Sequence, residues 1–441
     1  MTSTQRAYIF RAAVVAALGG FLFGYDTAII NGALVFLKQG FHWSEVQTEI
    51  AASSLLFGCL IGASVAGTLS DWAGRRRILL LAAVVFAVSS VASAFPNDLT
   101  QFCIVRIVAG TAIGMASMLS PLYIAEISPA KTRGMLVSMN QLAIVTGILV
   151  SYLTGYLMAG IGQESWRWML ASAALPSALF FGTLFTVPES PRWLVKEGRE
   201  DEAAGILQKL GEPVERLEEM KSAIAEEQGS IWQLFEPGLR IPLLIGVTMA
   251  VLQQVTGINT IIYYSSTIFK EQAGASSATD ALLPNVIIGL VNLICTLAAL
   301  ALIDRLGRKS LLLIASGGMG VALMLLGVVF KTSPHSPWIL VFMLCYVAAF
   351  SLGMGPTVWV IMAELFPTRI RGRAMSIATI ALWAACMLIA STFLSLVTAL
   401  TIAGAFWTYA AMCAFTFVFV WRMVPETKGK SLEEIERAWK R

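Results

Sequence analysis

The chain has 441 residues, of which 57% are hydrophobic and only 13% are charged, and its formal net charge is +4. Soluble globular domains carry about a quarter charged residues, so this composition excludes an ordinary soluble protein and indicates an integral membrane protein. We therefore expect a lipid bilayer, and no nucleic acid, as the partner of its surface.

Apolar runs long enough to cross a bilayer occur twelve times along the chain. They cover roughly residues 12–37, 48–70, 78–95, 100–125, 135–160, 167–187, 241–269, 283–303, 310–330, 338–363, 373–399 and 401–424. Runs of this length predict helices, whereas a membrane β-barrel would show short alternating segments. The first run lacks a cleavage-site pattern, so we expect it to remain as a membrane helix. The sequence thus predicts an all-α membrane protein with twelve transmembrane helices.

The six cysteines all lie within these apolar runs, and they show neither paired nor metal-type spacing. We interpret them as packing residues. We expect no metal site and no cofactor.

Basic residues are distributed unequally between the two sets of loops. On one side we place Lys38, Arg167, Lys270 and Lys331, whereas Arg106 lies inside a span and the other 26 of the 31 Lys and Arg lie on the opposite side. Loops rich in Lys and Arg remain in the cytoplasm. Both termini are therefore expected to be cytoplasmic.

Three loop motifs occur twice along the chain. Gly67–Arg77 (GTLSDWAGRRR) corresponds to Ala301–Lys309 (ALIDRLGRK). Likewise, EISPAKTRG at 126–134 corresponds to ELFPTRIRG at 364–372, and PESPR at 188–192 to PETKG at 425–429. The offset between the copies stays between 233 and 238 residues. This near-constant offset predicts two halves of six helices, duplicated in parallel.

The repeats and the composition together define the expected domains. Residues 1–187 form the first six-helix half and residues 240–424 the second, followed by a short cytoplasmic tail at 425–441. The charged segment 188–239 between the halves carries apolar residues at helical spacing, such as Ala203, Leu207 and Leu210. It predicts short cytoplasmic helices that brace the inner face.

The seventh span, VLQQVTGINTIIYY at 251–264, contains more polar groups than a membrane helix normally carries. Gln253, Gln254 and Asn259 stand on both sides of Gly257. Amides inside a membrane need partners, so they either connect packed helices or face a ligand cavity. Neutral donors and acceptors beside aromatic rings suit a polyhydroxylated neutral molecule such as a sugar. In the tenth span, Gly353, Gly355 and Pro356 predict a second interruption.

Two ionisable residues, Asp26 and Arg106, lie well inside the predicted spans. Counting the helical rise places Asp26 about 22 Å from the inner edge and Arg106 about 9 Å from the outer edge of a ~30 Å core. The two are therefore at similar depth. A salt bridge that merely satisfies both charges is one interpretation. In the other, Asp26 takes up a proton and Arg106 tunes its pKa.

These motifs together resemble the sugar porters of the major facilitator superfamily, over essentially the whole chain. The resemblance rests on the Asp-x-x-Gly-Arg-Arg/Lys loops in both halves, PESPR at 188–192 and PETKG at 425–429, Gln253-Gln254 with Gly257-Ile-Asn259, and Gly355-Pro356 followed by Trp359. It implies a sugar site between the halves and alternating access around it. The Gly24-Tyr25-Asp26 sequence is similar to that of proton-coupled members, whereas facilitative members carry Asn in place of this Asp.

The resemblance also implies which residues bind the sugar. Matching positions give Phe23, Gln141, Gln253, Gln254, Asn259, Asn292, Gly355, Trp359 and Trp383. Leu382 departs from the pattern, because many relatives have Asn there. One polar contact to the sugar is therefore expected to be missing.

Charged residues in the repeated inner loops are candidates for a cytoplasmic gate. Asp71, Arg75, Glu126 and Arg133 of the first half recur as Asp304, Arg308, Glu364 and Arg371 in the second. Surface ion pairs contribute little each, about 0–1 kcal/mol. A network that exists only while the inner side is closed can still bias a balanced equilibrium between two states.

From these features we expect a monomeric symporter that moves a monosaccharide with a proton across a bacterial plasma membrane. The expected sugar is a hexose such as D-glucose, with xylose and galactose as alternatives, and the proton gradient supplies the energy. A facilitative uniporter with a structural Asp26 is the alternative within transport. A non-transporting sugar sensor would carry a long signalling tail, whereas only residues 425–441 follow the last span. We expect no enzyme, because no nucleophile–base pair or phosphate loop is apparent.

Overall fold

The computed structural model describes residues 2–129, 132–213, 215–226, 239–366 and 371–428, and within these ranges every regular element is helical. The first half contains α1 (Ser3–Phe41), α2 (Glu45–Ala73), α3 (Arg75–Ala92), α4 (Leu99–Ile127), α5 (Arg133–Met158), α6 (Ser165–Ser172) and α7 (Ala174–Leu184). The linker contains α8 (Pro191–Lys196), α9 (Glu200–Leu210) and α10 (Glu215–Glu226). The second half contains α11 (Arg240–Val255), α12 (Ile258–Glu271), α13 (Ala278–Leu306), α14 (Arg308–Thr332), α15 (Trp338–Ala349), α16 (Gly355–Leu365), α17 (Arg371–Ala390) and α18 (Phe393–Met423).

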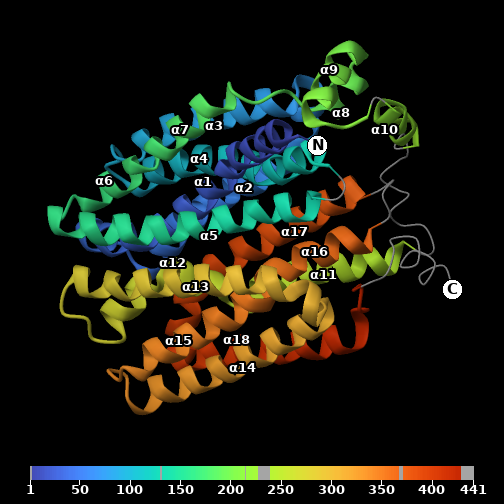
Figure 1. The fold of residues 1–441 in the computed structure, drawn as a ribbon. Coiled ribbons are helices and arrows are strands. Elements are labelled where there is room, and N and C mark those ends of the chain that lie inside the picture. The colour runs from blue at the N-terminus through green and yellow to red at the C-terminus, as the bar shows by residue number, and fades with distance from the viewer. Residues whose placement is uncertain (1, 130–131, 214, 227–238, 367–370, 429–441) are drawn as a thin grey trace.

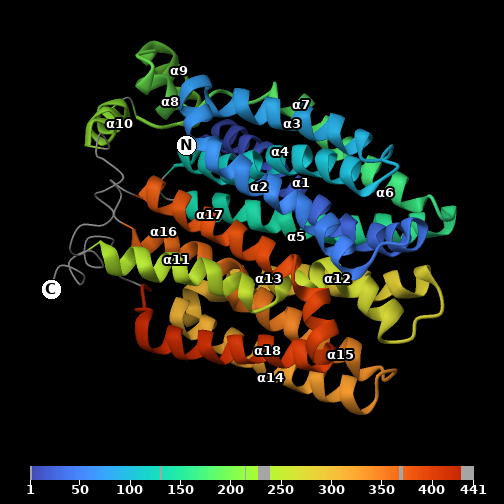
Figure 2. The ribbon, with the colours of Figure 1, turned by 180° about the vertical axis from the view of Figure 1, so that it is seen from behind.

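The helices form two stacked halves whose long axes run in the same general direction. In both views the first half lies above the second (Figures 1 and 2). The halves meet where α1 packs on α12, α5 on α13, and α2 on α17. The start of α1, the linker helices α8 to α10 and the end of α18 all lie at one end of the bundle, which we call the linker end (Figure 1). We call the opposite end the far end.

Ten helical stretches in the described part of the chain are long and apolar enough to cross a membrane. Two further spans complete the two sets of six. One is α3, which begins with three consecutive arginines and is therefore too charged at its start to be recognised by composition. The other consists of α6 and α7, which are separated at Ala173. Pro176 explains this break, because it has no N–H to donate to the carbonyl of Ser172.

The seventh span is interrupted as its sequence predicts. Gly257 separates α11 from α12 and has a φ of 97°, in the left-handed region that favours glycine. A Cβ at this position would also lie 2.8 Å from the ring of Tyr409. In the tenth span a π-helical turn, Phe350–Met354, precedes α16, which has Pro356 in its first turn. Both interruptions leave backbone carbonyl groups near the middle of the bundle available to accept hydrogen bonds from side chains.

The eleventh span is shorter than its composition suggests. Instead of continuing to 399, α17 ends at Ala390, and residues 393–400 form a short helical segment at the far end. The chain turns at Ser391 and Thr392, whose hydroxyls donate to the carbonyl of Leu388 at 3.2 and 2.7 Å. Such local bonds compete with the helix. The apolar residues on both sides hide this turn from a hydropathy analysis.

The linker helices are held to one another by a small hydrophobic core of their own, and hydrogen bonds attach them to the bundle. Trp193, Leu207 and Leu217 are buried in it. The indole N–H of Trp193 donates to the backbone carbonyl of Asp71 at 2.9 Å. The side chain of Gln5, at the start of α1, donates to the carbonyl of Gln208 at 3.3 Å. The predicted helical linker is thus attached to the first half at its linker end.

Candidate functional site

The interruption at Gly257 brings three amide side chains together in the middle of the bundle. Gln253 donates from Nε2 to the carbonyls of Met354 and Gly355, both at 3.0 Å. Gln254 donates to Oε1 of Gln253 at 3.2 Å, and Asn259 donates to Oε1 of Gln254. All three amides are less than 10% exposed. They therefore form a continuous row of neutral donors and acceptors that ends on the backbone of the broken tenth helix.

Aromatic rings and a further amide lie on the helices around this row. The ring of Phe23 on α1 meets the ring of Trp383 on α17 edge-on, with 5.1 Å between centroids. Asn292 on α13 is buried and accepts from the hydroxyl of Ser351 at 2.8 Å. Trp359 is half-buried on α16. Gln141 is half-buried on α5, and no hydrogen bond of its side chain is seen within the described residues.

Several buried polar atoms near the row make no hydrogen bond to any residue that the structure describes. They are Trp383 Nε1, the hydroxyl of Tyr263 and the hydroxyl of Thr27, which belong to residues with exposures of 2%, 1% and 3%. A buried donor or acceptor without a partner costs about 1–3 kcal/mol. A ligand rich in hydroxyl groups could bond such atoms, so the arrangement suits a neutral polyol better than an ion.

Sequence reasoning missed two members of this cluster. Cys386, which we interpreted as a packing residue, accepts a hydrogen bond from Asn259 with 3.1 Å between nitrogen and sulfur. The hydroxyl of Tyr263 lies beside both Cys386 and Thr27, without ideal hydrogen-bond geometry to either. Tyr263 could have been identified from the sequence, because two adjacent tyrosines follow the amides closely. The sequence held no comparable signal for Cys386.

Asp26 and Arg106 form the ion pair that their depths predicted. Both Oδ atoms of Asp26 accept from the guanidinium of Arg106, at 2.8 Å each. Both residues are 1% exposed, and Arg106 Nε makes no hydrogen bond within the described part of the chain. Two charges can be buried together because each is hydrogen-bonded to the other. Removing one partner therefore costs far more stability than removing both. The pair joins α1 to α4 within the first half.

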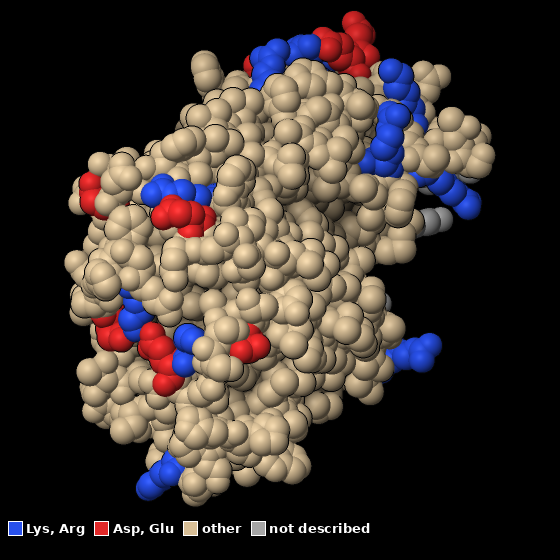
Figure 3. All heavy atoms as spheres, turned by 90° about the vertical axis from the view of Figure 1, so that its left-hand side faces the viewer, with Lys and Arg blue, Asp and Glu red and all other residues tan. Residues whose placement is uncertain are grey.

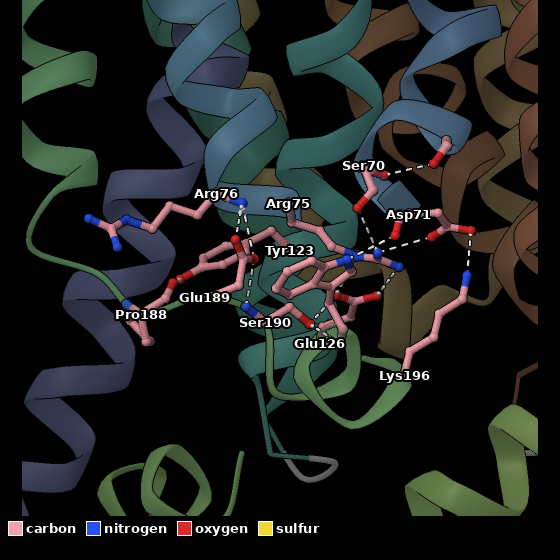
Figure 4. Close-up of polar contacts among 12 residues, drawn as sticks. Ser70, Asp71, Arg75, Arg76, Tyr123, Glu126, Pro188, Glu189, Ser190 and Lys196 are labelled. Carbon is pink, nitrogen blue, oxygen red and sulfur yellow. Dashed lines mark hydrogen bonds and ion pairs between the residues drawn. The ribbon is translucent and has the colours of Figure 1, made fainter. Parts of the chain in front are cut away.

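Charged residues at the linker end of the first half form a connected network (Figure 4). Arg75 pairs with Asp71 at 3.0 Å and with Glu126 at 3.2 Å, and Lys196 of α8 reaches Asp71 at 2.9 Å. Glu126 also accepts from the hydroxyl of Ser190. This network therefore ties α2, α3 and α4 to the start of the linker.

The second half repeats part of this arrangement. Arg308 pairs with Glu364 at 2.9 Å, and Glu364 also accepts from the hydroxyl of Thr427 at 2.5 Å. The side chains of Asp304 and Arg371 lie outside the described residues. Arg133 is half-buried and donates only a long bond, 3.5 Å, to the carbonyl of Ser128. The described ion pairs at the linker end thus lie within one half, within the linker, or between the linker and the first half.

Two glutamates of the repeated motifs cap the helices that follow the Asp-x-x-Gly-Arg loops. Glu189 accepts from the backbone N–H of Arg76 at 3.1 Å (Figure 4), and Glu426 accepts from that of Arg308 at 3.0 Å. A carboxylate is stabilising at a helix N-terminus. Burial raises the pKa of Glu189 above its usual value. Partial burial favours a higher pKa for Glu426, but hydrogen bonds from backbone N–H groups, led by that of Lys428, have the larger effect. The pKa of Glu426 is therefore below its usual value.

Gly74 is required by this capping geometry. Its φ and ψ of 98° and 152° lie in a region that is essentially restricted to glycine, and a Cβ would lie 2.5 Å from Oε2 of Glu189. We expect Gly74→Ala to destabilise the protein by about 1–3 kcal/mol, seen as a lower melting temperature in detergent. Gly182→Ala is the matched control, because nothing lies within 4 Å of its Cβ position and alanine favours a helix. Equal melting temperatures for the two variants would contradict this explanation.

At the far end, by contrast, polar contacts join the two halves. Lys38 of α1 pairs with Glu271 of α12 at 2.6 Å. Asn31 donates to the hydroxyl of Ser265 at 2.7 Å. Seen from this end, the surface is mostly uncharged, with charged groups in a few small clusters (Figure 3). The halves are therefore connected here by polar side chains.

Twelve membrane helices in two similar halves, arranged around a neutral polar cluster, are the architecture of a polytopic membrane transporter. A model of the family described as "Sugar (and other) transporter" matches residues 12–439. The chain belongs to this family, and its predicted fold class, that of the major facilitator superfamily, is confirmed.

Similar proteins and a similar solved structure support this assignment. The chain is 40% identical to the arabinose-proton symporter of Bacillus subtilis (strain 168), with 99% of this chain and 96% of that protein covered. It is also 40% identical to the D-xylose-proton symporter of Escherichia coli (strain K12), with 99% and 97% covered. A solved structure of the E. coli proton:xylose symporter of the major facilitator superfamily, bound to 6-bromo-6-deoxy-D-glucose, matches with a TM-score of 0.85 at 38% identity, covering 99% of this chain and 100% of that one.

Proposed function

We propose that this protein is a proton-coupled monosaccharide symporter of a bacterial plasma membrane. The observation that carries the proposal is the combination of a neutral amide and aromatic cluster with one buried carboxylate–guanidinium pair, Asp26 and Arg106. The two relatives named above are sugar–proton symporters, which supports the same conclusion. The amides would bind the sugar hydroxyls, and Asp26 would carry the proton.

The same proposal includes the sugar-binding residues. Gln253, Gln254 and Asn259 would bond hydroxyl groups when the sugar replaces some of the bonds that they now make to one another. Trp359 and Phe23 would cover the sugar ring. Leu382 is buried and offers no polar atom, so this side of the site would not bond a hydroxyl.

The sequence favours a hexose such as D-glucose, whereas the two relatives are named for arabinose and xylose. The solved relative contains a bromodeoxy derivative of glucose, so a six-carbon sugar is bound in that protein. Uptake into vesicles of labelled glucose, galactose, xylose and arabinose, with and without a protonophore, identifies the sugar. Uptake of none of these sugars would refute a monosaccharide substrate.

The contacts between the halves support a conformation that is closed at the far end. If the linker end is cytoplasmic, as the distribution of Lys and Arg predicts, this state is inward-facing. Alternating access then requires the far-end contacts to separate and the linker ends to approach each other.

A facilitative uniporter remains the second candidate, because the Asp26–Arg106 pair is fully buried and bidentate and could be structural. Sugar-driven proton flux in proteoliposomes distinguishes the two. A symporter acidifies the vesicle interior when sugar enters, whereas a uniporter does not.

The inner-gate proposal concerns the state in which the linker end is closed. In the described conformation Glu126 bonds Arg75 and Ser190 of its own half, so a gate would require contacts between the halves to form on closure. We expect Glu126→Gln and Arg371→Ala to favour inward-facing states without changing the sugar contacts. Spin-label distances across the linker end would lengthen on average. If the spin-label distance distributions of both variants equal those of the parent, the charged loops are structural connections and do not form a gate.

A further inference from the structure

Glu49 of α2 is a buried carboxylate at the far end, outside the sugar and proton sites described above. It is 2% exposed. Its Oε1 accepts from the backbone N–H of Ser395 at 2.8 Å, and its Oε2 from the Ser395 hydroxyl at 2.5 Å. No ion pair to Glu49 occurs in the part of the chain that the structure describes. The first half is therefore attached here to the second half through one carboxylate.

The N-terminus of α18 explains why a carboxylate is held at this place. Ser395 is the third residue of α18, so its N–H has no partner inside the helix. The partial positive charge of a helix start favours an anion. Glu49 supplies that anion from the other half of the molecule.

Aromatic residues lie beside the buried carboxylate, whereas the Ser395 side of the contact is exposed. Glu49 lies near Tyr264 of α12 and Tyr409 of α18. The ring of Phe393 packs against both tyrosines, with centroid distances of 5.4 and 6.4 Å. Hydrogen bonds to a charged group are stronger than neutral ones, and burial of the Glu49 carboxylate strengthens them further. The contact therefore contributes more than a surface ion pair would.

The segment that Glu49 holds has a cavity on one side. A cavity of about 360 Å³ separates residues 393–402 from α12, and Leu394, Val397 and Thr398 line it. At Thr401 the backbone has a φ of 68°, which is uncommon for a residue other than glycine and marks a strained junction with the rest of α18. Segment 393–400 thus has space beside it and a strained junction at its end.

The other polar contacts between the halves at this end are weaker candidates for controlling whether the far end opens. Lys38 binds Glu45 of its own half as well as Glu271, and the side chains of Glu45 and Glu271 are 40% and 35% exposed. Exposed ion pairs contribute little. Asn31 makes neutral bonds to Ser265 and to the backbone N–H of Ser266. Glu49 is the buried charge among these contacts.

We propose that Glu49 is a gating residue, which keeps the far end closed by holding the start of α18 and releases it when the transporter opens to that side. The inference rests on the proposed alternating access. It assigns Glu49 no contact with the sugar or with Asp26.

Hydrogen–deuterium exchange on the intact protein tests this proposal without any substrate. We expect Glu49→Gln to raise exchange in peptides that cover residues 45–55 and 391–400 and to lower exchange at the linker end. Losing a half-buried charged bond should shift the equilibrium toward the far-end-open state by roughly 10- to 100-fold. Ser395→Ala removes only the hydroxyl bond and should give a smaller shift in the same direction. The double variant should exceed Glu49→Gln only slightly, because both changes affect one contact.

Glu164→Gln is the control, since it removes a far-end carboxylate whose partner, Arg167, belongs to the same half. It should leave the exchange pattern unchanged. Unchanged exchange in both Glu49→Gln and Ser395→Ala would overturn the proposal. Unfolding of Glu49→Gln together with unchanged exchange in Ser395→Ala would also overturn it. If the parent transports no sugar but the exchange shifts as expected, the proposed function fails while the role of Glu49 stands.

Discussion

Asp26→Asn is expected to abolish sugar accumulation against a gradient and sugar-induced proton uptake. Asparagine keeps the shape of the side chain but cannot carry a proton. The bidentate pair with Arg106 is buried, so the carboxylate must separate from Arg106, or water must reach it, before a proton can be exchanged there. Proton coupling needs this conformational change, because the proton must load on one side and leave on the other. The measurement is proton flux on sugar addition to proteoliposomes.

Sugar binding and counterflow exchange should persist in Asp26→Asn, because the amide row and Trp359 are unchanged. The substitution leaves Arg106 buried without its carboxylate, which typically costs about 3–5 kcal/mol of stability. The double variant Asp26→Asn/Arg106→Gln removes both charges and should recover most of that stability while remaining uncoupled. Full proton-driven accumulation by either variant would refute the mechanism. Absence of sugar-driven proton flux in the parent would favour the uniporter.

The ion pair and the amide row show what polar residues in an apolar sequence can predict. Burying a charge or an amide in a membrane is costly, so such residues must have partners or a function. Counting helical rise was sufficient to place Asp26 and Arg106 at one depth, and the structure pairs them at 2.8 Å. The repeated loops likewise predicted two similar halves. These predictions depend on local sequence and on an internal repeat, both of which one chain contains.

Contacts between distant segments could not be predicted in the same way. Glu49 lies in the first turns of its helix, where an acidic residue is usually a solvated helix-end charge. Its partner Ser395 is 346 residues away, and only the packing of the two halves buries the carboxylate. Cys386 meets Asn259 across 127 residues for the same reason. The turn at Ser391 was missed because apolar residues continue on both sides of it.

Gln254→Ala is expected to weaken sugar binding about 5- to 150-fold, which corresponds to one lost hydrogen bond of about 1–3 kcal/mol in a buried site. Gln254 occupies the centre of the amide row, where it donates to Gln253 and accepts from Asn259. Its removal would leave a sugar hydroxyl without a partner and would also release the side chain of Asn259. Asn259→Ala should have an effect of similar size. Quenching of tryptophan fluorescence on sugar titration measures both affinities.

The double variant Gln254→Ala/Asn259→Ala distinguishes a shared binding site from general damage to the fold. Because the two amides bond each other, their effects should not add, and the double variant should lose less affinity than the product of the two single losses. Gln208→Ala is the control, since its side chain is exposed on linker helix α9, and it should bind sugar as the parent does. Proton coupling should be retained in the single variants once the sugar concentration is raised to saturate them, because Asp26 and Arg106 make no bond to these amides. Affinity equal to that of the parent in Gln254→Ala would remove this residue from the sugar site and leave the amide row as a contact between helices.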